Sequence, residues 1–308
     1  MNQAQQITLA LGGDWCGGYG LAPTPGHSSR DRGLKIWDAP DLAGGVGFHA
    51  FNGASWQEVR DELRALGLLS DERTHDRADL EAIAARRRER EAEQRRADAR
   101  RTARALEIWR ASGPVSGSLA ETYLRQARSI RRVILPPTLR FHPCIPFKPL
   151  APRNSGPILP AMVAAVAMPG ERTPCAVHIT FLSPDGLDKA DVDPPRKIVG
   201  PYKGAAVRLD PAGERLAVGE GIESTLSYGD HSGAPVWACL TAGNLETVHF
   251  PAGLKRLEAA HDVDANGRGQ KAADIVAARA FAAGVDAYLA PPPDGLNDWN
   301  AYAAREAA

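Results

Sequence analysis

Acidic residues stand where three short runs of the sequence end. Glu220 closes RLAVGE, Asp262 and Asp264 close LEAAHDVD, and Asp298 lies in DGLNDWN. If such runs are parallel strands, their carboxyl ends meet at one sheet edge, where open sheets of this kind bind ligands. Two carboxylates about 4 Å apart repel by roughly 4 kcal/mol at an effective dielectric constant of about 20, so the group needs a cation. Oxygen ligands favour Mg²⁺ or Mn²⁺.

The residues after the two aspartates are suited to phosphate. ANGRGQ predicts a turn in which Gly267 and Gly269 permit close backbone approach, and we predict that Asn266, Gly267 and Gly269 contact nucleotide or template. An Asp at a strand end is by itself more often a turn former or a helix cap. The combination is what indicates a site.

The segments that must position these acids alternate in type from about residue 211 onward. We predict strands at 215–220, 236–240, 254–264 and 285–290, with helices at 221–229, at 269–283 and from Trp299. This alternation is typical of βαβ units and a parallel sheet, hence of an α/β fold.

A strand ending in EG, a later strand ending in DVDANGRG and a DWN loop together resemble the Toprim domain over about residues 211 to 308. The resemblance implies a parallel sheet flanked by helices. It also implies catalytic roles for Glu220, Asp262 and Asp264, with Asp298 as a further metal ligand. Many Toprim domains have Asp four residues after the glutamate. Here Ser224 stands there and Glu223 precedes it, which leaves the role of Glu223 open.

The middle of the chain predicts a hairpin, with strands at 160–168 and 176–183, and then a basic stretch, DPPRKIVGPYKGAAVRL. The basic residues of this stretch are Arg196, Lys197, Lys203 and Arg208. They are either solvated loop charges or contacts to triphosphate and template. With SLAETYLRQAR and LPPTLRFHP, this region resembles the α+β subdomain before Toprim in primases of mobile elements.

Residues 1 to 70 are rich in Gly, Pro and aromatics. Strands near 34–37 and 46–51 and a helix over 56–66 are predicted, and the segment resembles the zinc-binding domain of phage and plasmid primases. Thr24, Ala50 and Ala54 stand at positions of the usual ligands, and His27 remains. We expect no zinc, with aromatic packing in its place; Cys16, His27 and His49 are poorly spaced as alternative ligands.

An Arg/Ala-rich stretch without Pro or Gly, at 71–112, predicts one long helix. It is either a solvated connecting helix with i,i+4 ion pairs or a helix that follows a phosphate backbone. The expected domains are therefore 1–70, the helical linker 71–112, the basic subdomain 113–210 and Toprim 211–308.

Composition limits the kinds of function and location that we expect for the protein. Lys plus Arg equals Asp plus Glu, 37 each, so any nucleic-acid surface must be local. The four scattered cysteines indicate reduced thiols, and there is no signal sequence or long apolar run, so we expect a cytoplasmic protein without membrane contact.

The whole chain resembles a phage- or plasmid-type DNA primase, a nucleotidyltransferase that makes RNA primers. The resemblance implies single-stranded DNA and ribonucleoside triphosphates as partners, Mg²⁺ or Mn²⁺ as cofactor, and a separately encoded replicative helicase. A GxxxxGK[ST] loop, which ATPase-linked Toprim nucleases carry, is absent. A metal-dependent nuclease and a non-catalytic replication adaptor that binds single strands stay open as alternatives.

Overall fold

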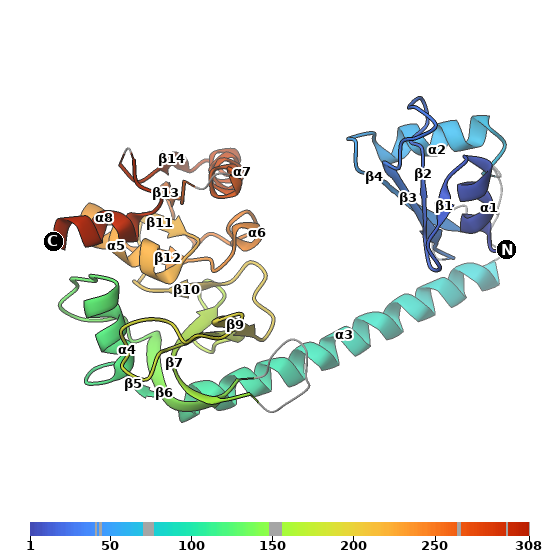
Figure 1. Cartoon of the computed structure of the whole chain (residues 1–308). Coiled ribbons are helices and arrows are strands. Elements are labelled where there is room, and N and C mark those ends of the chain that lie inside the picture. The colour runs from blue at the N-terminus through green and yellow to red at the C-terminus, as the bar shows by residue number, and fades with distance from the viewer. Residues whose placement is uncertain are drawn as a thin grey trace. The chain divides into compact units, whose positions relative to one another are not determined.

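The structure of the chain is a computed structural model. It describes residues 1–40, 42, 45–69, 77–147, 156–263, 266–293 and 295–307, and for residues 77–83 the backbone alone. The chain forms two compact units (Figure 1). We call them the N-terminal unit, Met1–Glu93, and the C-terminal unit, Gln94–Ala308.

The N-terminal unit is built on a four-stranded antiparallel sheet whose strands follow chain order. Its elements are α1 (Gln3–Ala10), β1 (Asp14–Trp15), β2 (Gly20–Ala22), β3 (Leu34–Asp38), β4 (Val46–Ala50) and α2 (Trp56–Ala65). The two strands and the helix that the sequence predicts are confirmed. The sequence pattern predicts neither α1 nor the short strands β1 and β2.

Alternation along the strands explains which face of this sheet is buried. In β3, Leu34 and Ile36 are buried, and the residues between them lie on the opposite face. Helix α2 starts at a capping box on Ser55 and buries Val59 and Leu63, which lie about one turn apart. These side chains form one core. Lys35 and Trp37, which alternate with Leu34 and Ile36, lie on the other face of the sheet, which we call the open face.

Helix α3 (Arg77–Ala111) is the long helix that the Arg- and Ala-rich composition predicts, and the predicted residues 71–76 lie outside the described residues. Ion pairs such as Arg87–Glu91, three or four residues apart, run along its exposed surface. Its last turns differ, because Ala105 and Ile108 are buried against the sheet of the C-terminal unit. In the described part of the chain, no helix is both long and apolar enough to cross a membrane.

The C-terminal unit is a mixed α/β structure built on one ten-stranded sheet. Its first elements are β5 (Gly113–Pro114), α4 (Leu119–Thr122), the π-helix η1 (Tyr123–Ala127), β6 (Leu139–Pro146), β7 (Ile158–Ala167), β8 (Ala176–Phe181), β9 (Arg196–Val199) and β10 (Ala206–Arg208). The later ones are β11 (Arg215–Gly219), α5 (Ile222–Ser232), β12 (Val236–Ala238), α6 (Ala242–Leu245), β13 (Arg256–Ala260), α7 (Arg268–Ala282), β14 (Asp286–Ala290) and α8 (Trp299–Ala307).

Two kinds of pairing meet in this sheet. Strands β12, β11, β13 and β14 are parallel, as the alternation of segments predicts. Strands β5 to β9 are antiparallel and include the predicted hairpin, β7 with β8. Strand β10 joins the halves, because it pairs antiparallel with both β7 and β12. The predicted boundary at residue 210 therefore falls within one continuous sheet.

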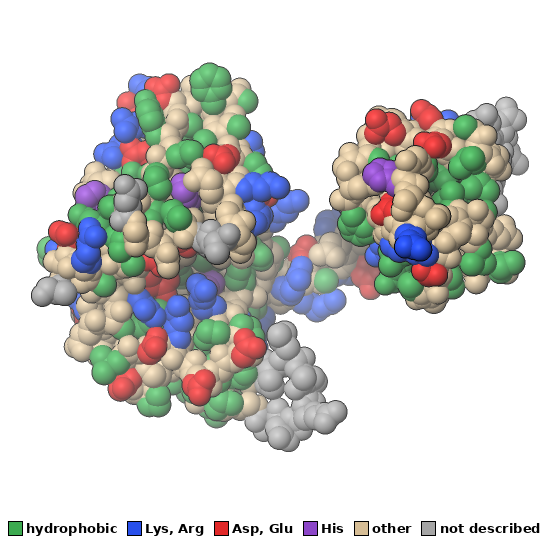
Figure 2. Space-filling view, turned by 45° about the horizontal axis from the view of Figure 1, so that its top comes forward, with side chains coloured by type: hydrophobic (Ala, Val, Ile, Leu, Met, Phe, Trp, Pro, Cys, Tyr) green, Lys and Arg blue, Asp and Glu red, His purple; other side chains and the backbone are tan. Residues whose placement is uncertain are grey.

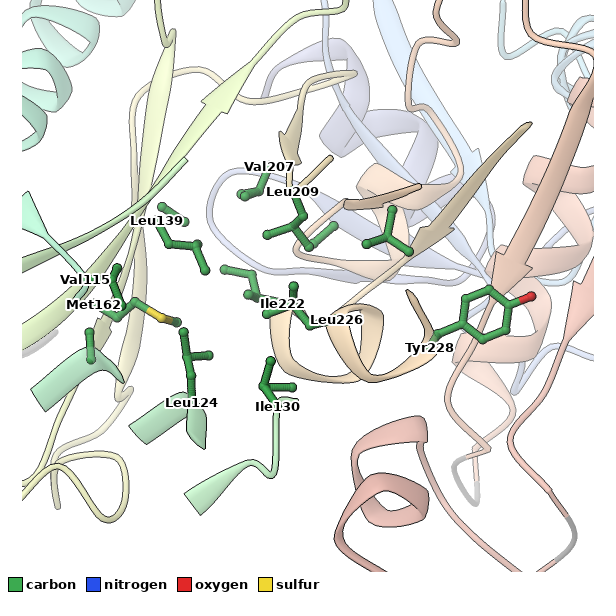
Figure 3. Close-up of a cluster of buried hydrophobic side chains, with 14 of the residues drawn as sticks. Val115, Leu124, Ile130, Leu139, Met162, Val207, Leu209, Ile222, Leu226 and Tyr228 are labelled. Atoms are coloured by element: carbon green, nitrogen blue, oxygen red, sulfur yellow. The ribbon is translucent and has the colours of Figure 1, made fainter. Parts of the chain in front are cut away.

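Helices cover both faces of the parallel half. Leu216 and Val218 of β11 pack in one core with residues of α6 and α7, while Ala217 packs in another core with residues of α5 and α8. The second core also includes Leu124 and Ile130, which lie beside Ile222 and Leu226 of α5 (Figure 3). Helix α5, which follows Glu220, is thus fixed against the antiparallel half.

Candidate active site

Glu220 and Asp262 leave the sheet at the same edge. Glu220 directly follows β11, and Asp262 follows β13 by two residues. These strands are adjacent and parallel, with Gly219 opposite Ala260. The two acids therefore stand at the carboxyl ends of neighbouring strands, which is the arrangement that the sequence predicts. Asp264, the third predicted acid, lies outside the described residues.

Ser224 of helix α5 holds the side chain of Asp262. Ser224 Oγ lies 3.1 Å from Asp262 Oδ1, and the backbone N–H of Trp299 donates to Ser224 Oγ at 3.3 Å. Since the oxygen of Ser224 accepts from Trp299, its hydroxyl hydrogen is available to Asp262. Where many Toprim domains have a carboxylate, this chain has a neutral donor that orients one.

Asp298, the predicted fourth metal ligand, caps a helix in the structure. Its Oδ1 accepts a hydrogen bond from the backbone N–H of Ala301 at 2.7 Å, in the first turn of α8. Its role as a metal ligand stays a prediction.

The amino end of helix α7 lies against the backbone of Asp262. A Cβ at Gly269 would stand 2.6 Å from the Asp262 carbonyl oxygen, so only glycine permits this approach. Gly267 has a φ of +64°, and Asn266 Oδ1 accepts from the backbone N–H of Arg268 at 2.8 Å. Both shape the turn into α7, whose free N–H groups favour anions. Contact of Asn266, Gly267 and Gly269 with nucleotide stays a prediction.

The donors at this edge are carboxylate oxygens, a chemistry that suits Mg²⁺ or Mn²⁺. Within the residues that the structure describes, no group of three or more His, Cys, Asp or Glu is placed to hold a metal ion. Of the three predicted catalytic acids, Glu220 and Asp262 are described and lie at this edge. Asp264 would complete the set.

Glu223, one residue before Ser224, has quite different partners. Its side chain is buried, and its Oε1 accepts a hydrogen bond from the hydroxyl of Tyr123 at 2.6 Å. The Tyr123 oxygen accepts in turn from Arg128 Nε at 3.0 Å, and Arg128 Nη2 pairs with Asp188 at 3.0 Å. Glu223 therefore begins a chain of polar contacts that runs from α5 through η1 to the segment between β8 and β9.

Charges near Glu223 keep it ionised despite burial. Burial raises the pKa of Glu223, but the charge of Lys189 and the hydrogen bond from Tyr123 are the main causes that lower it, and the net result is a lowered pKa. Burial also lowers the pKa of Lys189, and it lowers the pKa of His178 to about 4. His178 is therefore neutral at pH 7, and Glu223 is a buried anion beside a half-buried ammonium group.

The predicted basic stretch is divided between two faces of the sheet. Lys197 Nζ lies 4.3 Å from the ring centroid of Phe147. Arg196, its neighbour in β9, pairs in register with Thr180 and projects from the opposite face, because side chains alternate along a strand. Only Arg196 of these two shares a face with His178.

The other two predicted basic residues are Lys203, which precedes β10, and Arg208, the last residue of β10. Lys203 is exposed, and Arg208 donates to the backbone carbonyl of Glu171. On the face shown in Figure 2, Lys and Arg side chains gather across the middle of the C-terminal unit. Whether these residues bind nucleotide stays a prediction.

Sequence reasoning missed Tyr123, Arg128, His178 and Lys189 as neighbours of the site. They precede β11 by 26 residues or more. Tyr123 and Arg128 lie within SLAETYLRQAR, but that segment does not indicate which residues they contact. One signal was available: HITF places polar His178 and Thr180 on one face of an otherwise apolar strand. Buried polar residues in such a pattern call for a partner.

In the N-terminal unit, the positions of the expected zinc ligands have other contacts. Thr24 is buried and its backbone N–H donates to Asp31, while His27 Nε2 lies 3.1 Å from Asn52 Nδ2. The open face of the sheet carries a pocket of about 490 Å³. It is lined by Gly18, Tyr19, Lys35, Trp37, His49 and Phe51.

Comparison with known proteins identifies the C-terminal region. Residues 215–308 match the family model of the Toprim domain, and residues 99–209 match a model described as a domain of unknown function, DUF7146. No curated protein matches the chain. The C-terminal unit therefore ends in a Toprim domain.

Solved structures with similarity to the chain include three primases. The primase fragment of the bacteriophage T7 primase-helicase protein is 16% identical, with a TM-score of 0.35, over 48% of this chain and 61% of that one. The Aquifex aeolicus primase, with zinc-binding and RNA polymerase domains, is 14% identical, with a TM-score of 0.40, over 99% and 80%. The RNA polymerase domain of Mycobacterium tuberculosis primase DnaG is 14% identical, with a TM-score of 0.36, over 68% and 82%. This chain thus spans about three-fifths of the T7 fragment.

Proposed function

We propose that the chain is a DNA primase that synthesises short RNA primers on single-stranded DNA during replication of a phage, plasmid or other mobile element. The observation that supports it is the Toprim match, in a chain whose Glu220 and Asp262 stand at one edge of the parallel sheet. Carboxylates so placed serve nucleotidyl transfer, in which the protein mainly positions groups and neutralises charge.

Each residue of the site has a role in this proposal. Glu220, Asp262 and Asp264 hold Mg²⁺ or Mn²⁺, which when bound supplies positive charge at the reacting phosphate. Ser224 fixes the orientation of Asp262. Glu220 also accepts the proton of the attacking ribonucleotide 3′-hydroxyl.

Basic groups attract the substrates in this proposal. Arg196 and Lys203, both exposed, steer the triphosphate and the template, and the amino end of α7 offers N–H groups to phosphate. Lys197 and Arg208 contact the template from the other side of β9 and from β10. A separately encoded helicase would deliver the single strand, in the cytoplasm.

The N-terminal unit, in this proposal, is the counterpart of a primase zinc-binding domain that folds on its hydrophobic core without zinc. Thr24, Ala50 and Ala54 replace ligands there. Its open face stacks unpaired template bases on Trp37 and Phe51, since Phe51 is 64% exposed and both residues line the pocket.

Incorporation of radiolabelled ribonucleotides tests the proposal. The purified chain, given single-stranded DNA, ribonucleoside triphosphates and Mg²⁺ or Mn²⁺, should make short RNA that is sensitive to ribonuclease. Degradation of the DNA without incorporation would show a nuclease instead. Binding of the single strand that is indifferent to metal, with no product, would show an adaptor.

A further inference from the structure

Asn244 is a buried residue whose amide oxygen and both amide hydrogens are engaged. It lies in the short helix α6 and is 4% exposed. Its Oδ1 accepts from the backbone N–H of Gly204 at 2.7 Å, and its Nδ2 donates to the backbone carbonyls of Ala205 at 2.8 Å and Cys239 at 2.9 Å. Because an N–H only donates and a carbonyl only accepts, these partners allow a single orientation of the amide. A buried amide paired in this way holds its partners rigidly.

The carbonyl of Cys239 that Asn244 holds belongs to the peptide group that contacts Glu220. The Cys239 carbonyl and the Leu240 N–H are the two ends of one planar peptide group. The Leu240 N–H donates to the carbonyl of Glu220 at 2.8 Å. One residue earlier, the Cys239 N–H donates to the carbonyl of Gly219 at 2.8 Å. Asn244 therefore fixes the plane of a peptide group whose other end holds the backbone of a predicted catalytic acid.

Leu240 has a backbone conformation that a leucine rarely adopts. Its φ is +74°, in the left-handed region that is unfavourable for residues other than glycine. Such a conformation persists only where the surrounding contacts impose it, and it is typical of functional sites. Here the peptide group before Leu240 is hydrogen-bonded at both ends, and the chain must turn directly afterwards from β12 into α6. The strain at Leu240 is thus consistent with a peptide group that is held in place for a purpose.

The other partners of Asn244 lie in the turn that leads into the antiparallel half of the sheet. Gly204 and Ala205 directly precede β10, which pairs with β7 of that half. The backbone N–H of His249 donates to the carbonyl of Gly204 at 2.9 Å, and a Cβ on Gly204 would stand 2.7 Å from the His249 ring. This turn is therefore closely packed. It gives Asn244 a fixed support on one side, with the peptide group that holds Glu220 on the other.

We propose that Asn244 is a positioning residue for Glu220, which it holds through the Cys239–Leu240 peptide group. We call Asn244, with the three backbone groups that it binds, the amide clamp. Because a ligand that is held in place binds metal more tightly, the amide clamp increases the affinity of the sheet edge for Mg²⁺ or Mn²⁺. The position of Glu220 then depends on the antiparallel half of the sheet. This inference rests on the proposed function, in which Glu220 is a metal ligand.

Binding of Mn²⁺ tests the amide clamp without catalysis. The electron paramagnetic resonance signal of free Mn²⁺ gives the Kd of the full chain in the absence of nucleotide and DNA. Asn244→Ala should raise this Kd about tenfold, as is usual for loss of a group that orients a metal ligand. Val276→Ala is the matched control, because it removes methyl groups from the core in which α6 packs and should leave Kd unchanged. An unchanged Kd for Asn244→Ala would refute the proposal.

A double-mutant cycle identifies the group that the amide clamp holds. In the Glu220→Gln background, Asn244→Ala should have little further effect on the Kd for Mn²⁺, because the carboxylate that the clamp positions is gone. In the Asp262→Asn background, the full effect should persist. Equal effects of Asn244→Ala in both backgrounds would show that Asn244 supports the fold as a whole, and would contradict the proposal.

Hydrogen exchange detects the amide clamp in the absence of metal. The Leu240 N–H donates to Glu220, so Asn244→Ala should speed its exchange with deuterium, whereas Val276→Ala at a similar melting temperature should not. Wild-type exchange at Leu240 in Asn244→Ala would show that the peptide group does not need the clamp. If Asn244→Ala does not fold, Asn244→Ser, which keeps one hydroxyl donor, should show the same changes to a smaller degree.

The outcomes distinguish this inference from the proposed function. If Asn244→Ala weakens Mn²⁺ binding and the wild type makes no RNA, the amide clamp stands and the primase assignment is wrong. If the wild type makes RNA and Asn244→Ala binds Mn²⁺ as the wild type does, the primase assignment stands and the clamp is wrong. If both stand, Asn244→Ala should also raise the Mn²⁺ concentration for half-maximal ribonucleotide incorporation about tenfold.

Discussion

At the scale of single residues, Ser224 determines how Asp262 faces the site. Its hydroxyl contacts Asp262 Oδ1, and Trp299 fixes the hydroxyl from behind. Hydrogen bonds that orient a metal ligand typically change metal affinity by about 10- to 100-fold. We therefore expect Ser224→Ala to raise the Mn²⁺ concentration for half-maximal activity about tenfold, with Ser224→Thr close to the wild type. If Ser224→Ala and the wild type need the same Mn²⁺ concentration, Ser224 does not orient a metal ligand.

His178 gives the fold a dependence on pH. Burial lowers its pKa from 6.5 to about 4, so the unfolded chain binds a proton at a higher pH than the folded chain. The stability that this adds is complete above pH 6.5 and is lost as the pH falls from 6.5 to about 4. The loss is roughly 3 kcal/mol.

We expect His178→Gln to make the free energy of unfolding fall less steeply between about pH 6.5 and about pH 4.5 than in the wild type. Urea denaturation at several pH values measures the two slopes. His249→Gln, at an exposed position, is the control. Equal slopes in the wild type and His178→Gln would show that His178 titrates alike in both states.

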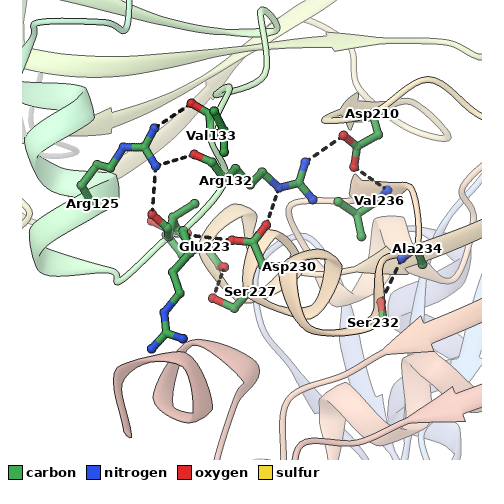
Figure 4. Close-up of polar contacts among 12 residues, drawn as sticks. Arg125, Arg132, Val133, Asp210, Glu223, Ser227, Asp230, Ser232, Ala234 and Val236 are labelled. Carbon is green, nitrogen blue, oxygen red and sulfur yellow. Dashed lines mark hydrogen bonds and ion pairs between the residues drawn. The ribbon is translucent and has the colours of Figure 1, made fainter. Parts of the chain in front are cut away.

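At the scale of elements, one arginine ties helix α5 to the strands around it. Arg132 Nε pairs with Asp230 of α5 at 2.7 Å, and its Nη1 pairs with Asp210, after β10, at 2.8 Å (Figure 4). Asp210 also accepts from the backbone N–H of Val236 in β12. Gly229 leaves room for the arginine, because a Cβ there would be 2.3 Å from its Nη2. The bridge fixes the helix that carries Ser224 and Glu223.

Removal of Arg132 should therefore be costly. Its side chain is 13% exposed, and Arg132→Met leaves two partly buried carboxylates without their cation. Loss of one partner of a buried pair costs about 3–5 kcal/mol, against at most about 1 kcal/mol for an exposed pair. Chemical denaturation should show this difference between Arg132→Met and Arg104→Met, whose pair with Glu107 is exposed. Equal losses would mean that the bridge adds little.

Element prediction from the sequence succeeds where the patterns are strong. The alternating segments after residue 211 predict β11, β12, β13 and β14 and the helices α5, α7 and α8, and the structure confirms these. The short helix α6, between β12 and β13, is not predicted. Helix α1 is not predicted, because QAQQITLA has a weak apolar face. Strand β9 is not predicted, because it follows two prolines and its sequence indicates a loop. Because the strand is not predicted, the sequence does not show that Arg196 and Lys197 project from opposite faces of the sheet.

The candidate site is predictable only in part. Strand ends locate Glu220 and Asp262, since a parallel sheet brings them together. Sequence spacing cannot show that Ser224 and Glu223, adjacent along a helix, have different partners, because the phase of α5 depends on packing. It also cannot show that Tyr123 meets Glu223, since a contact over 100 residues of chain depends on tertiary structure.

At the scale of the whole molecule, we propose that the N-terminal unit has its own surface for single strands. Trp37 and Phe51 line its open face, and each stacked base contributes about 1–3 kcal/mol. We expect Trp37→Ala and Phe51→Ala each to weaken binding of a fluorescent oligothymidine by about tenfold or more. Trp56→Ala is the matched control, because that ring stacks on Phe48 and does not line the pocket. Equal affinities for all three variants would exclude the face as a binding surface.

The central claim is that carboxylates at one sheet edge act together in metal-dependent nucleotidyl transfer. Its most direct test is ribonucleotide incorporation on single-stranded DNA by Glu220→Gln and Asp262→Asn, with Asp274→Asn on the exposed side of α7 as the control. We predict that both site variants lose activity by about a thousandfold or more, which corresponds to at least about 4 kcal/mol of transition-state stabilisation, while the control keeps it. Incorporation at the wild-type rate by either site variant, folded as the wild type is, would contradict the claim.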